Sequence, residues 1–494
     1  MMDRASLSAR IQEILRSGKK RAGEDAGPAV EDEEAAFARR CAADEASAAA
    51  SDTLGGRVVD GPAGPCLVVE RRYEGPRPHG REPLARYAEG LHQGSEALGL
   101  LLPGSQGALA PLFFDLETTG LSGGAGTYAF LVGCGWFEGD SFLTRQYFLR
   151  GFGEERALLH AVRAFVQEYP PSLRDQRDTC DPRAPGPRPL APIVTYNGRA
   201  FDLPLMETRF SMHRLATPFG AMEHLDLLFP ARRLWSRRLS RAGADRRALL
   251  AGAFPEDADR VSCALTVLEE DILGLAREGD VPGWEIPGRY FAYARTGDAR
   301  ALEAVFEHNR LDLVSLGALT AIVVEMLSGR REAADRRELL ALARLYDGLG
   351  RAAEAERCYV AAAAPDGLFE CAPDASARAE ALHWVALHHR RARRFPQAAE
   401  CWNDLLALPG LDPRLRREAL EALAVHHEHR ARDLAAARRF ALRALDLVPG
   451  GRNHDELQHR VGRLARKLAA GPAPAGPAGP HAADMFAPPV NRAG

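Results

Sequence analysis

The fold is decided by the stretch Pro111-Leu112-Phe113-Phe114-Asp115-Leu116-Glu117-Thr118-Thr119-Gly120-Leu121. An apolar run is followed by two acids two residues apart and then by a Thr-Thr-Gly turn. Because side chains at positions i and i+2 of a strand share a face, Asp115 and Glu117 present their carboxylates side by side. Adjacent carboxylates resist ionisation unless a cation lies between them, and Mg²⁺ prefers oxygen ligands. The stretch therefore predicts either a metal site on a buried strand or a strand end with two solvated acids.

Composition indicates a soluble protein with several domains. A chain of 494 residues has room for two or three full-sized cores. A net charge of -3 excludes a globally basic nucleic-acid binder, so any nucleic-acid surface must be a local patch. The eight cysteines contain no C-x-x-C, which fits a reducing cytosol. The chain shows no secretory h-region and no long apolar run, so we expect a cytoplasmic protein that does not contact membranes.

The chain before the acidic strand predicts little regular structure. Residues 1–55 indicate a short helix, at 5–17, and a flexible linker. Residues 56–108 indicate a small β or irregular extension, with a strand or hairpin at 64–74 and many Gly and Pro residues from 75 onwards. His79 and His92 in this segment are expected to be surface or packing residues.

An α/β pattern extends over residues 109–330. We expect strands at 128–136 and 142–148, paired across Glu138-Gly139-Asp140, then a helix at 154–169 and a mobile insertion at 170–192. A further strand at 192–196 leads into the turn Asn197-Gly198, and Pro204 suits the first turn of a helix. Asp202 thus lies where a strand ends and a helix begins, a common position for active groups in open α/β sheets.

Helices dominate the rest of this region. One is expected at 262–275 and a long one from 298 or 299 to 327. The long helix carries His308 and Asp312 four residues apart, hence on one face. Between the strand at 192–196 and the helix at 262–275, residues 231–247 include seven arginines. These arginines either form a solvated face or contact phosphates.

Residues 335–450 read as three pairs of helices. Small residues recur in the second helix of each pair, and Ala355, Ala398 and Ala437 are spaced by 43 and 39 residues. The pattern indicates degenerate tetratricopeptide-like repeats, with a plain helical bundle as the alternative. Residues 471–494 are rich in Ala, Gly and Pro and are expected to be disordered.

Four acids from separate segments form the candidate site: Asp115, Glu117, Asp202 and Asp312. Acids from distant segments can surround two divalent ions, which stabilise the attacking and leaving oxygens in phosphoryl transfer. His308, one turn before Asp312, is placed to accept a proton from the attacking water.

Three segments, 114–121, 196–204 and 308–316, together resemble the three exonuclease motifs of the DEDD superfamily, which includes proofreading 3′-5′ exonucleases with a ribonuclease-H-like fold. They read Phe-Asp-Leu-Glu-Thr-Thr-Gly-Leu, Tyr-Asn-Gly-Arg-Ala-Phe-Asp-Leu-Pro and His-Asn-Arg-Leu-Asp-Leu-Val-Ser-Leu. The chain looks most like a bacterial branch that fuses this domain to tetratricopeptide repeats. Further matches include His224-Leu225-Asp226 and Asp280-Val281-Pro282-Gly283. The resemblance covers residues 110–330 and, more weakly, the repeats.

The resemblance implies roles for individual residues. Asp115, Glu117, Asp202 and Asp312 would hold two Mg²⁺ or Mn²⁺ ions, and His308 would be the general base. The residues bordering the terminal nucleotide would be Thr118, Thr119, Leu121, Asn197 and Phe201. The alternative is that these residues only form turns and pack against their neighbours. Asp226 would be structural.

One departure concerns His308. In the histidine subclass of the superfamily the base lies five residues before the last Asp, and in the tyrosine subclass four. Here a His stands at the four-residue spacing. The alternative is that His308 is a structural helix residue and that metal alone activates the water.

The expected fold is a ribonuclease-H-like domain, with a mixed central sheet flanked by helices, followed by an all-α repeat domain. The expected function is metal-dependent 3′-5′ exonuclease action on DNA or RNA, with a single-stranded 3′ end as substrate and a protein partner on the repeats. The alternatives are a non-catalytic nucleic-acid-binding scaffold and a structure-specific endonuclease on the same fold.

Overall fold

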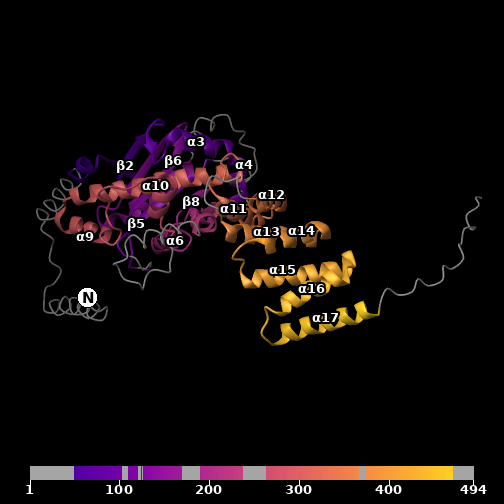
Figure 1. Ribbon diagram of the computed structural model, residues 1–494. Coiled ribbons are helices and arrows are strands. Elements are labelled where there is room, and N and C mark those ends of the chain that lie inside the picture. The colour runs from indigo at the N-terminus through magenta and orange to yellow at the C-terminus, as the bar shows by residue number, and fades with distance from the viewer. Residues whose placement is uncertain are drawn as a thin grey trace, which may run out of the picture.

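Figure 1 shows the computed structural model, which describes residues 49–102, 110–120, 124, 126–169, 190–236, 263–365 and 374–470. Several predicted features lie outside the described residues. They are the helix at 5–17, Leu121, residues 170–189 of the insertion, the arginines from Arg237 to Arg247, and the tail at 471–494.

A seven-stranded mixed sheet forms the centre of the first region, in the order β1-β2-β7-β6-β5-β8-β9. The strands are β1 (Arg57–Gly61), β2 (Gly64–Tyr73), β5 (Leu112–Thr118), β6 (Ala129–Glu138), β7 (Ser141–Phe148), β8 (Ile193–Thr195) and β9 (His224–Asp226). Pairing is antiparallel from β1 through β5 and parallel from β5 through β8 to β9. The predicted mixed sheet flanked by helices is confirmed.

The predicted hairpin between β6 and β7 is also confirmed. Glu138 pairs with Ser141 across the two-residue turn Gly139-Asp140. Gly139 has φ of 62°, a left-handed conformation that suits a tight turn matched to the twist of the strands.

Strand β5 separates two apolar clusters because its side chains alternate between the faces of the sheet. Leu112, Phe114 and Leu116 join a cluster that includes α5 (Glu155–Glu168), α6 (Asp202–Met212) and α9 (Ile286–Thr296). Phe113 joins a cluster that includes the long helix α10 (Glu303–Leu327). Asp115 and Glu117 share the face of Phe113, so both acids point toward α10.

Residues 75–102 are more regular than the small β or irregular extension that the sequence indicated for residues 56–108. A short two-stranded sheet, β3 (Pro78–His79) with β4 (Glu82–Pro83), leads into α3 (Leu84–Gln93) and α4 (Ser95–Leu101), which pack along α10 (Figure 1). Leu84, Tyr87 and Leu91 are buried at helical spacing, but the Gly and Pro residues before them hid the pattern. His79 is a buried packing residue, as expected, with Nε2 2.8 Å from Ser315 Oγ on α10.

The helix expected at 262–275 is shorter and irregular. It consists of α8 (Leu265–Leu268), followed directly by one π-helical stretch, η5 (Glu269–Leu273). Gly274, at φ of 70°, ends it in a left-handed conformation. Single π-helical turns are rare and are often found at functional sites. Here the turn carries the buried Glu269.

Beyond residue 335 the protein is helical, as predicted, and the helices extend away from the sheet as a stack (Figure 1). They are α11 (Arg336–Gly348), α12 (Ala352–Ala363), α13 (Ala375–Arg391), α14 (Phe395–Ala407), α15 (Pro413–His426), α16 (Leu434–Leu445) and α17 (Arg452–Ala469), with the π-helical η7 (His427–Ala431) after α15. Each helix packs on the next. The three expected helix pairs are present, and α17 is an additional helix that the sequence pattern did not indicate.

The first helix pair shares a core with the sheet region. Trp235 is fully buried and donates its Nε1–H to Glu338 Oε1 on α11 at 2.7 Å. Tyr346 donates its hydroxyl to the carbonyl of Leu327, at the end of α10, at 2.8 Å. One apolar cluster continues from α10 into α11, α12 and α13. Within the described part of the chain, none of the helices is both long and apolar enough to cross a bilayer.

Candidate active site

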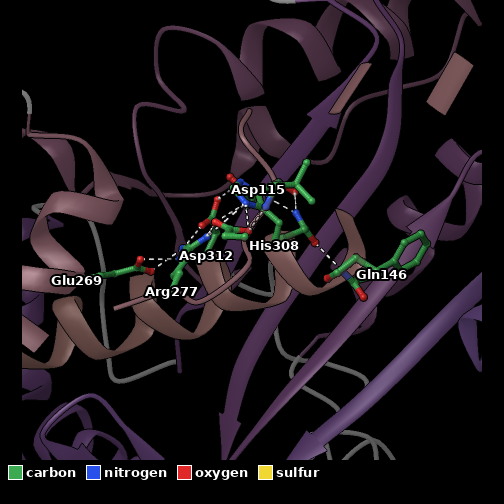
Figure 2. Close-up of polar contacts among 10 residues, drawn as sticks. Asp115, Gln146, Glu269, Arg277, His308 and Asp312 are labelled. Atoms are coloured by element: carbon green, nitrogen blue, oxygen red, sulfur yellow. Dashed lines mark hydrogen bonds and ion pairs between the residues drawn. The ribbon is translucent and has the colours of Figure 1, made fainter. Parts of the chain in front are cut away.

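The structure brings the four predicted acids to the face of the sheet that α10 covers. Asp115 and Glu117 lie on β5, Asp202 is the first residue of α6, and Asp312 lies on α10. Figure 2 shows Asp115 and Asp312 beside His308. Glu117 and Asp202 are buried, with 8% and 6% of their surface exposed.

Electrostatics show that these carboxyls act on one another. Burial raises the pKa of Asp115 well above its ordinary value, and the charges of Asp312 and Asp202 raise it further. Burial, followed by the charges of Asp115, Asp312 and Asp202, does the same to the pKa of Glu117. Burial raises the pKa of Asp202 to about 7, with Asp226 and Asp312 adding to the effect. Three acids are thus held where their ionised forms are costly.

Asn309 fixes Asp115. Its Nδ2 donates to Asp115 Oδ2 at 2.8 Å, and its Oδ1 accepts from Gln146 Nε2 on β7, also at 2.8 Å. Gln146 Nε2 donates in addition to the carbonyl of Phe306 at 2.9 Å, which settles which way both amides point. Gly133 on β6 makes room, because a Cβ there would collide with the Asn309 amide.

Arg277 lies between Glu269 and Asp312 (Figure 2). Its Nε and Nη2 donate to Glu269 at 2.7 and 2.6 Å, and Nη2 also donates to Asp312. Its Nη1 donates to Asp280 at 3.0 Å. The guanidinium therefore joins the π-helical turn, the loop after it and α10. It pairs with Asp312 directly, while the pKa values of Asp115, Glu117 and Asp202 stay raised.

His308 lies between Asp280 and Asp312. Its Nδ1 is 2.8 and 2.9 Å from the two carboxylate oxygens of Asp280, and its Nε2 is 3.6 Å from Asp312 Oδ2. The hydrogen bond and charge of His308, with the charge of Arg277, outweigh burial and hold the pKa of Asp280 below its ordinary value.

The donor set fits hard divalent ions. Among the residues that the structure describes, Glu117, His308 and Asp312 form a group whose donor atoms all lie within 4.8 Å of one another. Asp115 and Asp202 do not join that group at this distance, but they interact with it electrostatically. Carboxylate oxygens suit Mg²⁺ and Mn²⁺, and a cation between these acids would relieve the raised pKa values.

The turn before Asp202 is held by Asp226, at the end of β9. Its Oδ1 accepts from the backbone N–H of Asn197 at 2.8 Å and of Leu228 at 3.1 Å, and its Oδ2 accepts from Arg199 N at 3.1 Å. Asn197 has φ of 64°, a left-handed conformation that Asn tolerates better than most residues. The carboxylate of Asp226 thus has the positioning contacts expected of a structural residue.

The remaining predicted residues make turn and packing contacts. Thr118 donates its hydroxyl to the carbonyl of Gly120 at 2.8 Å, and Thr119 Oγ1 accepts from Tyr128 N at 2.9 Å. Phe201 packs partly buried against the cluster beneath α6. These contacts match the turn and packing alternative, and the nucleotide-binding roles stay predictions.

Four residues of the site received no role from the sequence: Glu269, Arg277, Asp280 and Asn309. Two of them carried a signal, since Asn309 directly follows His308 and Asp280 opens the segment Asp280-Val281-Pro282-Gly283. Glu269 and Arg277 carried none, because only the folded chain places them beside Asp312.

Comparison with known proteins agrees with this geometry. Residues 112–324 match the model of a family described as RNase_H superfamily. The chain is also similar to the uncharacterized protein YprB of Bacillus subtilis, with 28% identity over 366 residues, which covers 72% of this chain and 74% of YprB. Because 366 residues exceed the segment 112–324, the similarity extends beyond that segment.

Proposed function

We propose that the protein is a metal-dependent 3′-5′ exonuclease that hydrolyses phosphodiester bonds of DNA or RNA. The observation that carries the proposal is the convergence of Asp115, Glu117, Asp202 and Asp312 on one face of the sheet, with three of their pKa values raised. The similarity of residues 112–324 to the RNase_H superfamily supports nuclease chemistry at this place.

The residues divide the work as follows. Asp115, Glu117, Asp202 and Asp312 would hold two Mg²⁺ or Mn²⁺ ions, which supply stabilisation of the charge on the attacking and leaving oxygens. His308 Nε2 faces the acids and would accept the proton of the attacking water. Asn309 holds the Asp115 carboxylate in one orientation. Thr118, Thr119, Leu121, Asn197 and Phe201 would border the terminal nucleotide of a single-stranded 3′ end.

The repeats would recruit a protein partner. A groove of about 790 Å³ runs between α13, α14, α15 and α17. Its lining combines apolar side chains with charged ones of both signs, namely Trp402, Leu387, Val425, Arg390, Arg417, Arg460, Glu418, Glu421 and Glu456. A groove lined by both apolar and charged side chains fits a protein partner.

The test uses purified protein with 5′-labelled and 3′-labelled oligonucleotides of DNA and RNA, in Mn²⁺, Mg²⁺ or EDTA. The proposal expects stepwise shortening of the 5′-labelled strand, immediate release of mononucleotide from the 3′-labelled strand, and no reaction in EDTA. Internal cuts would point instead to an endonuclease. Binding without cleavage in any metal would point to a scaffold.

A further inference from the structure

We propose that Asp280 is a positioning residue that holds His308 in the tautomer protonated on Nδ1, so that the Nε2 lone pair faces Glu117 and Asp312. The inference rests on the proposed function and adds to it a residue from outside the four-acid set. It concerns which nitrogen of His308 is free to accept a proton.

The contacts of Nδ1 fix its protonation. Both oxygens of Asp280 lie within 2.8 and 2.9 Å of it, and a carboxylate can only accept hydrogen bonds. The competing donor, Arg277 Nη1, is 3.4 Å away. The two short contacts to acceptor atoms therefore require a proton on Nδ1, and the neutral ring then carries none on Nε2.

Asp280 is itself held in place. Its Oδ1 accepts from the backbone N–H of Val281 at 2.8 Å, and its Oδ2 accepts from Arg277 Nη1 at 3.0 Å. Arg277 is anchored in turn by two hydrogen bonds to Glu269, which is fully buried. Hydrogen bonds between charged groups thus connect Glu269, on the π-helical turn, through Arg277 and Asp280 to the imidazole of His308. In each of these bonds the donor and the acceptor are known.

A proton on Nδ1 leaves the Nε2 atom of the neutral His308 ring free to accept a proton. This atom is 3.6 Å from Asp312 Oδ2 and belongs, with Glu117, to the group of donor atoms within 4.8 Å. In the Nδ1–H tautomer it offers a lone pair to the space between the acids. In the opposite tautomer it would carry a proton and could accept none. Asp280 therefore decides whether His308 can serve the reaction.

The substitution Asp280→Asn separates the two tautomers. The amide replaces one of the two acceptor oxygens beside Nδ1 with an NH₂ donor and removes the negative charge that favours a proton on Nδ1, while Val281 N and Arg277 Nη1 compete for the remaining oxygen. This change favours the Nε2–H tautomer, as replacing the orienting carboxylate does in the serine-protease triad. Asp298→Asn is the matched control, because it removes a surface carboxylate that pairs with Arg300 at 2.6 Å.

The readout is the ¹⁵N–¹H long-range correlation spectrum of the full chain at about pH 8, with and without Mg²⁺. The His308 signals are assigned by their loss in His308→Gln. We expect the Nδ1–H pattern in the parent and in Asp298→Asn, and the Nε2–H pattern in Asp280→Asn. In kinetics, Asp280→Asn should lower kcat on the order of 10- to 100-fold with little change in KM, as is usual for residues that orient a site.

The parent spectrum alone can overturn the inference, even where Asp280→Asn does not fold: an Nε2–H pattern for His308 in the parent contradicts it. So does an Asp280→Asn protein that is folded and keeps the parent's kcat. An inactive parent that shows the Nδ1–H pattern would overturn the proposed nuclease function instead, because the spectrum needs no substrate.

Discussion

At the scale of single residues, the site gathers more negative charge than its own cations balance. Arg277 forms direct hydrogen bonds with Asp312, Asp280 and Glu269 but supplies only one positive charge, and Asn309 supports Asp115 without a charge. Burial, together with repulsion between the acids, raises the pKa values of Asp115, Glu117 and Asp202. A site of this kind destabilises the protein until a cation binds, so stability and function oppose each other here.

Asp202→Asn should stabilise the metal-free protein in a pH-dependent way. The folded protein holds the pKa of Asp202 at about 7, above the ordinary value of 3.8, so ionisation costs stability as the pH rises between them. The variant should gain roughly 1 to 4 kcal/mol in free energy of unfolding at about pH 8 and little near pH 4. Thermal unfolding in EDTA measures this.

Asp298→Asn is the control for that experiment. The hydrogen bonds of Arg300 lower the pKa of Asp298 to about 2, so removing this carboxyl should bring no gain at high pH. Mn²⁺ should raise the unfolding temperature of the parent more than that of Asp202→Asn. Equal stability of parent and Asp202→Asn at about pH 8 in EDTA would show that the acids are not crowded as described.

His308→Ala distinguishes a general base from a metal ligand. As a base, His308 contributes on the order of 10² to 10⁴ in rate, and its loss leaves the four acids and hence metal affinity intact. Calorimetric titration with Mn²⁺, alongside single-turnover rates, measures both quantities. Asp312→Asn is the comparison and should weaken binding as well as rate.

Two results would remove the base role. Near-parental rates in His308→Ala would make the imidazole a structural group. A large loss of Mn²⁺ affinity would instead place Nε2 among the ligands, as the short distances within Glu117, His308 and Asp312 allow.

The four acids could be predicted because each lies in a short segment whose local pattern is informative, such as the i, i+2 pair Asp115 and Glu117 on β5. The network that supports them could not. Arg277 forms a hydrogen bond with Asp312, which lies 35 residues later in the chain. The π-helical turn that precedes Arg277 was not predicted by any local sequence pattern. Likewise α3 and α4 were missed because Gly and Pro residues precede a short apolar repeat, and their helical state depends on packing against α10.

At the scale of elements, the helical region repeats its turns as well as its helices. The first helix of each pair ends in a left-handed residue, at Gly350, Arg393 and Arg432, with φ of 72°, 59° and 57°. These positions are spaced by 43 and 39 residues, as are the buried Ala355, Ala398 and Ala437. Aspartates cap the first helix of every pair, at Asp335, Asp374 and Asp412. The shared spacing supports an internal repeat, while its assignment to the tetratricopeptide class stays a prediction.

Arg393→Gly and Arg432→Gly should each stabilise the helical region. Left-handed backbone costs a residue with a Cβ about 1 kcal/mol, and glycine adopts it freely, as Gly350 does in the first pair. We expect each variant to gain roughly 0.5 to 1 kcal/mol in free energy of unfolding by urea titration. Arg393→Ala and Arg432→Ala are the controls, because alanine keeps the strained Cβ. A gain of equal size in the alanine variants would attribute the effect to the lost charge.

At the scale of the whole molecule, the first helix pair belongs to the sheet region as much as to the stack. The apolar cluster that contains α10 also contains Leu340, Tyr346 and Tyr359 of α11 and α12. The hydrogen bond from Trp235 to Glu338 is buried between the two regions. The shared apolar core therefore extends beyond residue 335 into the helical stack.

Two truncations test this shared core. Ending the chain at residue 334 should expose Trp235, Leu327 and their neighbours, at about 1.5 to 3 kcal/mol for each large apolar side chain, which together rivals the stability of a typical domain. That protein should be insoluble or unfold at a much lower temperature.

Ending the chain at residue 409 instead keeps α11 to α14. This truncation should leave a folded protein that hydrolyses short oligonucleotides at near-parental rates, because the site residues all precede residue 313. Soluble yield, thermal unfolding and oligonucleotide hydrolysis measure these outcomes. A stable, active chain ending at residue 334 would show that the shared core is dispensable, and a folded but inactive chain ending at 409 would place α15 to α17 in the reaction.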